Sequence, residues 1–385
     1  MNFDFDEVEQ TFQAAVRRFA LARILPDAAR WDRGERLPRS RVLELGELGV
    51  LGIRVPQAFG GSAGSFVLAG IAAEELARGD MASTIFLQLA LIAGELITQH
   101  APADMQASVL PALASGHRTI AFGLTETGAG SDAAALRTTA RQVGEQWIIN
   151  GEKVSNSLAG SADDCIVFAR IEGAGAGTRG MGAILVPLAN VGVTRQVYDS
   201  VGQKGSERGA LRFDDVAVPR ANQIGTTGRG FMQAMDAFDF NRAIIALACI
   251  GSALQAVEET VEHLKLRQTF GKPLARQQGV AFQIAEHLTH LTAARHLAYH
   301  VLWLRDQGRP HTKEAAMAKW YGPKVSVDAI HACLILHGWT GYDRSLPYEQ
   351  RLRDVIGMEI GDGTPEIMKA VVAREVFGRE FNSLR

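Results

Sequence analysis

One carboxylate in the sequence stands directly before a predicted helix, where a ligand could bind. Asp362 precedes Gly363-Thr364-Pro365-Glu366, and this order predicts a helix that starts with Thr364 as its N-cap and Pro365 in its first turn. A loop that enters a helix points backbone N–H groups at whatever lies in front of it. The run around Asp362 can therefore be an ordinary helix start, a ligand site, or both at once.

A second run, from 125 to 132, combines small residues with hydroxyl groups (TETGAGSD). Glycine and alanine allow a ligand to approach the backbone closely. The hydroxyls of Thr125 and Ser131 at the two ends can donate and accept hydrogen bonds. Taken alone, the run fits either a site for a flat or phosphorylated ligand or an ordinary polar turn.

Other candidate motifs fail on their context. The run Gly175–Gly180 matches G-x-G-x-x-G, but Met181-Gly182 and a strand follow it where a pyrophosphate site needs a helix, so we expect a flexible hairpin loop. Four histidines share one predicted helix at offsets that do not place three on one stripe, so we expect no metal site: His287, His290, His296 and His300.

The composition indicates a globular protein and argues against nucleic-acid binding and membrane spans. The 385 residues are 47% apolar with a net charge of −2, which allows two or three domains with a buried core and gives no reason to expect nucleic acid as a partner. The longest apolar runs, such as Ile244–Ile250, are too short to cross a bilayer, and the N-terminus is acidic rather than signal-like. Three widely spaced cysteines indicate buried thiols in a reducing cytoplasm.

The order of elements is helical, then β, then helical. We expect domains over 1–117, 118–228 and 229–385. Short apolar runs predict five strands, with Asn150-Gly151 as a turn: 119–124, 146–149, 165–169, 183–186 and 192–195. After the glycine-rich hinge at 225–230, apolar periodicity predicts four helices: Phe231–Lys265, Gly279–Asp306, Thr312–His337 and Pro365–Phe377.

Four motifs in matching order resemble the acyl-CoA dehydrogenase family. The run at 125–132 resembles its T-E-P-G-A-G-S-D signature, with Thr127 in place of proline. WIINGEK at 147–153 resembles W-x-(I/L)-N-G-x-K, RQTFGKP at 267–273 resembles R-x-x-F-G-K, and Arg353-Asp354 with GDGTPEI at 361–367 resembles the closing motif. The resemblance spans nearly the whole chain. It implies a helical N-terminal domain, a middle β-sheet domain, a C-terminal four-helix bundle, FAD, and a homotetramer.

The resemblance also implies a role for single residues. Asp362 becomes the base that removes the α-proton of an acyl-CoA thioester, and its own N–H becomes a donor to the thioester oxygen. Substrate contacts fall on Ser131, Asp239, Arg242 and Gly363. FAD contacts, some of them reaching a neighbouring subunit, fall on Phe122, Leu124, Thr125, Gly130, Ser131, Ser155, Ser157, Arg267, Thr269, Phe270, Gln278, Gly338, Gly341, Thr364 and Glu366. An electron-transferring flavoprotein is the expected acceptor.

Several departures from the family pattern point to the substrate. The base is aspartate where most members have glutamate, Ser155-Asn156-Ser157 replaces a tryptophan-containing triplet, and Ile335 and Trp339 replace a glutamine and a glycine. Asn241 stands where some relatives carry the base, and it cannot serve as one. A shorter base and a missing tryptophan favour a cyclic or branched acyl group, similar to cyclohexane-carboxyl-CoA. A nitroalkane oxidase-like enzyme and a non-catalytic flavoprotein that binds an acyl carrier are the alternatives.

Overall fold

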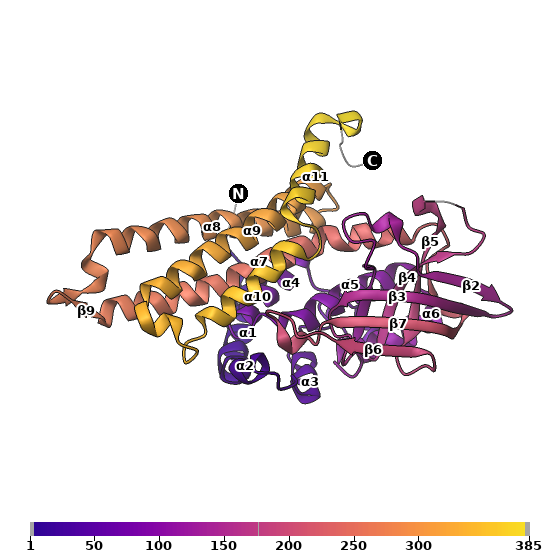
Figure 1. Ribbon diagram of the computed structural model, residues 1–385, viewed down its shortest axis with the longest axis horizontal. Coiled ribbons are helices and arrows are strands. Elements are labelled where there is room, and N and C mark those ends of the chain that lie inside the picture. Colours follow the sequence, from indigo (N-terminus) through magenta and orange to yellow (C-terminus); the bar gives the residue numbers. More distant parts are fainter. Residues whose placement is uncertain (1–3, 176, 382–385) are drawn as a thin grey trace.

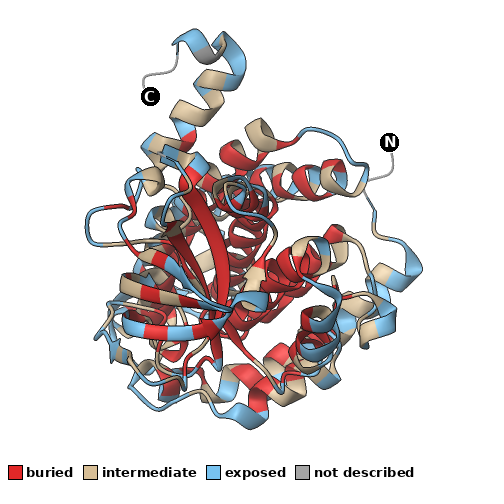
Figure 2. Cartoon of the chain, turned by 90° about the vertical axis from the view of Figure 1, so that its right-hand side faces the viewer, coloured by how far each residue is buried: buried red, intermediate tan, exposed pale blue. Residues whose placement is uncertain are grey.

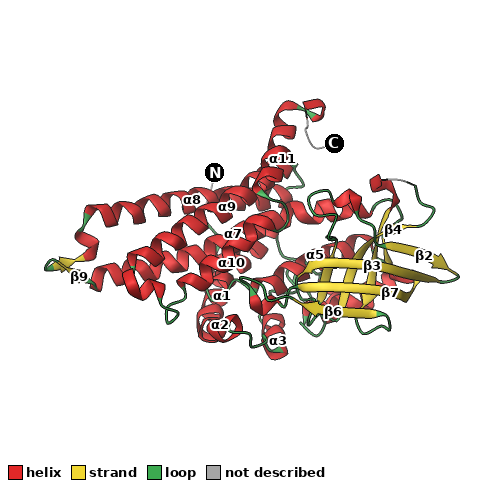
Figure 3. Ribbon diagram, in the orientation of Figure 1, coloured by secondary structure: helices red, strands yellow, loops and turns green. Residues whose placement is uncertain are grey.

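The structure is a computed structural model that describes residues 4–175 and 177–381. Helices occupy one part of the molecule and strands gather at its other end (Figure 1, Figure 3). The expected three-part fold is confirmed. The limits expected for the three domains stay a prediction, and residue 176 of the glycine-rich loop lies outside the described part of the chain.

The N-terminal part is helical because apolar residues recur at helical spacing between proline and glycine breaks. A π-helical turn, Ala20–Ile24, joins its first two helices. Ser65 caps α4, and α5 is buried along most of its length. The helices are α1 (Glu7–Phe19), α2 (Leu25–Asp32), α3 (Arg39–Glu47), α4 (Phe66–Ala77), α5 (Thr84–His100) and α6 (Ala103–Ala114).

Eight strands of the middle part form one mixed sheet. Its order is β6-β7-β3-β2-β4-β5-β8, and β1 pairs with β4 in parallel. The strands are β1 (Ile120–Gly123), β2 (Thr139–Val143), β3 (Gln146–Asn156), β4 (Asp164–Ile171), β5 (Met181–Pro187), β6 (Val193–Val197), β7 (Gly209–Pro219) and β8 (Gln223–Ile224). Five of them lie where the sequence predicts strands, whereas β2, β7 and β8 were not predicted.

The expected turn at Asn150-Gly151 is wrong. Both residues lie inside β3, where the pairing with β7 shifts register between Ile149 and Gly151. Gly151 has φ 142°, and a Cβ there would stand 2.6 Å from Oγ1 of Thr138. A glycine is required here because β2 approaches closely at a bulge, not because the chain reverses.

The C-terminal part is a bundle of long helices: α7 (Gly230–Leu266), α8 (Gln278–Asp306), α9 (Thr312–Leu336), α10 (Tyr348–Ile360) and α11 (Pro365–Phe377). A two-stranded hairpin, β9 (Gln268–Thr269) with β10 (Lys272–Pro273), joins α7 to α8 at the end of the bundle far from the large sheet (Figure 1). Helix α7 has the length and apolar composition of a membrane span, but 89% of its most apolar window is buried inside the fold. It is a core helix, and Figure 2 shows the same heavy burial in the central helices and strands.

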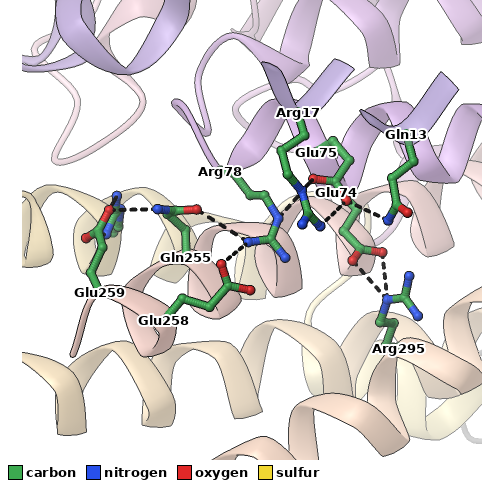
Figure 4. Close-up of polar contacts among 10 residues, drawn as sticks. Gln13, Arg17, Glu74, Glu75, Arg78, Gln255, Glu258, Glu259 and Arg295 are labelled. Atoms are coloured by element: carbon green, nitrogen blue, oxygen red, sulfur yellow. Dashed lines mark hydrogen bonds and ion pairs between the residues drawn. The ribbon is translucent and has the colours of Figure 1, made fainter. Parts of the chain in front are cut away.

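Buried ion pairs fasten the N-terminal helices to the bundle (Figure 4). The Glu75 side chain on α4 is fully buried and pairs with Arg17 of α1 at 2.7 Å and with Arg78 at 3.0 Å. Its neighbour Glu74 accepts hydrogen bonds from Arg295 of α8 at 2.9 Å. Since each buried carboxylate has a cationic partner, the desolvation of these charges is offset.

Candidate active site

Asp362 lies in the tight turn between α10 and α11. It has φ 54° and Gly363 has φ 112°, and aspartate is one of the few residues that tolerate the left-handed region. The expected N-cap is confirmed, because the Thr364 side chain accepts a hydrogen bond from the N–H of Ile367. The turn therefore presents the half-buried Asp362 side chain ahead of a helix N-terminus.

Asn241 holds the Asp362 carboxylate. Nδ2 of Asn241 donates to Oδ2 of Asp362 at 2.7 Å, and Asn241 is buried on α7. This hydrogen bond occupies one carboxylate oxygen and fixes its direction. The other oxygen, Oδ1, makes no hydrogen bond within the described residues, so it is the oxygen that can accept a proton.

Arg242 and Asp239 form a chain of contacts behind the turn. Nε of Arg242 donates to the backbone carbonyl of Asp362 at 3.4 Å, and its guanidinium pairs with Asp239. The second oxygen of Asp239 accepts from the hydroxyl of Thr312 on α9 at 2.6 Å. Asp239 and Arg242, two of the residues expected to contact substrate, are thus engaged with the protein, and their observed contacts fix the turn.

Residues expected at the flavin lie on the sheet side of this turn. Phe122 on β1 packs against Phe238 of α7, with ring centroids 5.3 Å apart. Phe238 directly precedes Asp239 in the sequence. Thr125 follows on the same segment, and its carbonyl accepts from the N–H of Val154 on β3 at 2.9 Å. The aromatic contact joins the sheet segment to the helix that carries the substrate-side residues.

A buried lysine fixes the loop that begins at Leu124. Nζ of Lys153 on β3 donates to the carbonyl of Leu124 at 3.2 Å and pairs with Glu126 at 2.7 Å. Burial lowers the pKa of Lys153, and the Glu126 charge opposes this effect. Glu126 also accepts the backbone N–H groups of residues 137 and 138. Lys153 and Glu126 therefore fix the base of the loop, while Gly130 and Ser131 at its tip are exposed.

A second bulge in β3 shapes the place where the family pattern has its tryptophan. The pairing with β7 shifts register between Lys153 and Asn156, and Ser155 has φ 57°. Left-handed backbone at a serine is uncommon, and such bulges recur beside active sites. Ser155 is exposed and Ser157 is half-buried, so both hydroxyls lie beside the bulge.

The polar groups on this face fit a large polar cofactor. Across the described chain, the hydroxyls of Thr125, Ser131, Ser155 and Ser157 make no hydrogen bond to another residue. The Glu366 side chain at the start of α11 likewise has no partner there. Several unused donors and acceptors on the segments around β1 and β3 and at the start of α11 are what a multiply hydrogen-bonding ligand such as FAD requires.

The remaining residues expected at FAD are not brought to this turn. Arg267, Thr269 and Phe270 lie on the β9–β10 hairpin, at the end of the bundle remote from the sheet (Figure 1). The hairpin group also includes Gln278 at the start of α8 and the 3₁₀ turn Gly338–Tyr342, which contains Gly338 and Gly341. His263 and His337 stack at 4.1 Å and join these segments. One chain therefore carries two separate halves of the expected cofactor site.

Sequence reasoning missed two residues that the structure places at the turn. Asn241 was dismissed as a base, yet it holds the carboxylate. Lys319 on α9 was not considered, yet Nζ donates to the carbonyls of Met358 at 2.6 Å and Gly363 at 3.2 Å. A lysine at helical spacing among Ala315, Ala318 and residues 322 and 325 was the available signal, since this face is otherwise apolar.

Comparisons with known proteins identify the family. Three family models match in order: the acyl-CoA dehydrogenase N-terminal domain at 6–117, the middle domain at 121–216 and the C-terminal domain at 228–377. Acryloyl-CoA reductase (NADH) of Anaerotignum propionicum is 37% identical over 98% of this chain and 97% of that protein. Human short-chain specific acyl-CoA dehydrogenase, mitochondrial, is 33% identical over 96% of this chain and 90% of that protein.

A solved structure agrees with the sequence matches. Butyryl-CoA dehydrogenase from Megasphaera elsdenii superposes with a TM-score of 0.94 at 30% identity, covering 98% of this chain and all of that one. The chain belongs to the acyl-CoA dehydrogenase family. It is an FAD-dependent oxidoreductase of that family, as its sequence motifs predicted.

Proposed function

We propose that this enzyme removes a proton from Cα and a hydride from Cβ of an acyl-CoA thioester, with Asp362 as the base. The observation that supports the proposal most directly is the hydrogen bond from Asn241 to Oδ2 of Asp362, which leaves Oδ1 as the free acceptor. When bound, FAD accepts the hydride at N5. The protein supplies the base, the orientation of the thioester and the exclusion of water.

The α-proton of a thioester is weakly acidic, so the developing enolate needs a hydrogen-bond donor at its oxygen. We assign this donor to the backbone N–H of Asp362. Within the described residues that N–H makes no hydrogen bond. A base and a donor on the same residue hold the Cα–H and the thioester oxygen at a fixed separation, which favours enolisation of one bound conformer.

The length of the base suggests which acyl groups fit. Aspartate reaches about 1.5 Å less far than glutamate from the same backbone, and a misplacement of that size costs on the order of 100-fold in rate. The turn cannot move to compensate, because Asn241 and Arg242 bind it. We propose a cyclic or branched acyl group, whose substituted Cα lies nearer to the base.

A substrate panel tests this proposal. Anaerobic bleaching of the flavin band at about 450 nm, the usual visible absorption of the cofactor, is followed with straight, branched and cyclic acyl-CoAs. We expect Asp362→Glu to lower the rate with cyclic substrates more than with butyryl-CoA. Equal effects on both classes would rule out the cyclic or branched preference. Loss of bleaching in Asp362→Asn with FAD retained separates the base from cofactor binding and argues against a non-catalytic flavoprotein.

The two separated halves of the FAD site support an oligomer, for which we propose the homotetramer. The hairpin exposes Phe270 at 96%, and Trp339 and Tyr342 are exposed nearby. Large apolar side chains on the surface mark interaction sites.

Two experiments test the assembly and the electron acceptor. Sedimentation of the FAD-loaded enzyme measures the oligomeric state. The rate of reduction of an electron-transferring flavoprotein, compared with that of oxygen, identifies the acceptor. Rapid turnover with oxygen and a nitroalkane, but not with acyl-CoA, would overturn the proposed function.

A further inference from the structure

Helix α10 stops one hydrogen bond short of where its i to i−4 pattern could continue. In an α-helix each N–H bonds to the carbonyl four residues before it, so the N–H of Asp362 has Met358 as its natural partner. The last such bond observed is from Gly361 to Gly357 at 3.2 Å. The carbonyl of Met358 is instead taken by Nζ of Lys319 at 2.6 Å.

We propose that Lys319 is a positioning residue: by taking the carbonyl of Met358, it leaves the N–H of Asp362 free to bind the thioester oxygen. This inference rests on the proposed function, in which Asp362 is the base. Without Lys319, the carbonyl of Met358 is an unsatisfied group at a helix C-terminus. The N–H of Asp362 is the donor that would satisfy it if the helix continued by one more hydrogen bond.

The second contact of Lys319 orients the part of the loop that follows Asp362. Nζ also donates to the carbonyl of Gly363 at 3.2 Å, while Arg242 donates to the carbonyl of Asp362. In a trans peptide the N–H points opposite to the preceding carbonyl. The N–H groups of Gly363 and Thr364 therefore point away from the two cations. Lys319 and Arg242 together turn the carbonyl side of this loop toward α7 and α9 and its N–H side away from them.

The lysine is an unusual choice for a merely structural contact. Its side chain is fully buried, and burial lowers its pKa to about 8, an effect that the charges of Asp362 and Glu359 oppose and that of Arg242 adds to. The other facing group, Cys249 on α7, has a pKa raised to about 12 by burial and stays neutral. Lys319 is thus charged at neutral pH, and its bond to Met358 is charge-assisted.

Lys319→Met tests the inference, with Lys324→Met as the matched control on the exposed face of the same helix. We expect Lys319→Met to bind FAD and to lower kcat by about 10²–10³-fold, the usual effect of losing one oxyanion donor, with little change in KM. An α,β-unsaturated acyl-CoA binds without being dehydrogenated. Its thioester C=O stretch should move to lower wavenumber in the native enzyme and in the control, and stay unshifted in Lys319→Met.

Hydrogen exchange gives a readout that does not depend on activity. The amide of Asp362 should exchange rapidly in the native enzyme, become protected on ligand binding, and be protected without ligand in Lys319→Met. If Lys319→Met does not fold, Lys319→Arg, which keeps a cationic donor, should retain the C=O shift. Slow exchange at Asp362 in the ligand-free native enzyme overturns the inference even if neither variant folds.

Failure of the inference is distinguishable from failure of the proposed function. If Asp362→Asn is inactive while Lys319→Met keeps native kcat and the native C=O shift, only the role of Lys319 is wrong. If Asp362→Asn retains flavin reduction, the proposed base is wrong and the positioning role falls with it.

Discussion

Replacement of Asn241 by aspartate places a second carboxylate against the proposed base. The new oxygen would lie about 2.7 Å from Oδ2 of Asp362, the present distance from Nδ2 to that oxygen. Two unit charges at this separation repel by about 6 kcal/mol at an effective dielectric constant of 20. Asn241→Asp should therefore keep one proton shared between the two carboxylates at neutral pH, as in other close carboxylate pairs.

The expected result is a displaced pH profile. In Asn241→Asp the acidic limb of kcat/KM should move up by about 2–4 pH units, and activity at pH 7 should fall by about 100-fold and recover in part as the pH rises. Asn241→Leu is the matched control, since it keeps the volume and adds no charge; it should lose about 10-fold in kcat and shift the limb by about 1 unit at most. Steady-state rates between pH 5.5 and 9.5 decide the matter. An unchanged limb in Asn241→Asp would refute the assignment of Asp362 as the base.

Three further predictions concern stability and assembly. Burial raises the pKa of Asp80 to about 7 and that of its neighbour Asp354 well above its usual value. The contribution of the protonated Asp80 carboxyl to the free energy of unfolding is therefore fully present below about pH 4 and is lost as the pH rises through about 7. Asp80→Asn should raise Tm at pH 8 and leave it unchanged at pH 4. Glu75→Gln removes the buried carboxylate that Arg17 and Arg78 share; Arg78 keeps its pair with Glu258, so the change should cost about 3 kcal/mol in urea unfolding. Phe270→Ser should lower FAD content and the tetramer fraction in sedimentation, whereas Val191→Ser, which is 95% exposed in the middle part, should change neither.

Four of the five helices described in the bundle could be predicted closely because their apolar faces are continuous, whereas α10 (Tyr348–Ile360) was not predicted. The sequence predicted a helix over 231–265, and α7 spans Gly230–Leu266. Because α7 is buried along nearly its whole length, its apolar residues recur at helical spacing from end to end. The N-cap at Thr364 was equally predictable, since a threonine followed by proline has a local physical cause.

Strand β7 and the bulges of β3 could not be predicted in the same way. β7 carries two consecutive exposed aspartates, Asp214 and Asp215, which interrupt the alternation expected of a strand. Asn150-Gly151 has the composition of a turn, but Asp215 of β7 pairs with Asn150 in the folded chain. A pairing partner more than 60 residues away decides the conformation here, and no local pattern contains it.

Some site residues could be predicted from local motifs, and others could not. Asp362, Thr125 and Ser131 belong to short motifs whose members are neighbours in sequence, so a pattern can identify them. Asn241 and Lys319 reach the turn from α7 and α9, and they are 121 and 43 residues away from Asp362. Their roles depend on how the helices pack. A lone lysine in a helix is expected on the solvent face, and only the apolar residues at helical spacing around it indicate that it is buried.

These two residues also bear on why the base is aspartate. Asn241 fixes one carboxylate oxygen of Asp362, Arg242 fixes the carbonyl of the same residue, and Lys319 fixes the carbonyl of Gly363. A glutamate on the same backbone would carry its carboxylate about 1.5 Å further out and would leave Nδ2 of Asn241 without its acceptor. The cost of an unpaired buried donor, about 1–3 kcal/mol, opposes the longer base. The turn and the aspartate are therefore matched to each other, and a substrate must bring its α-carbon to the base.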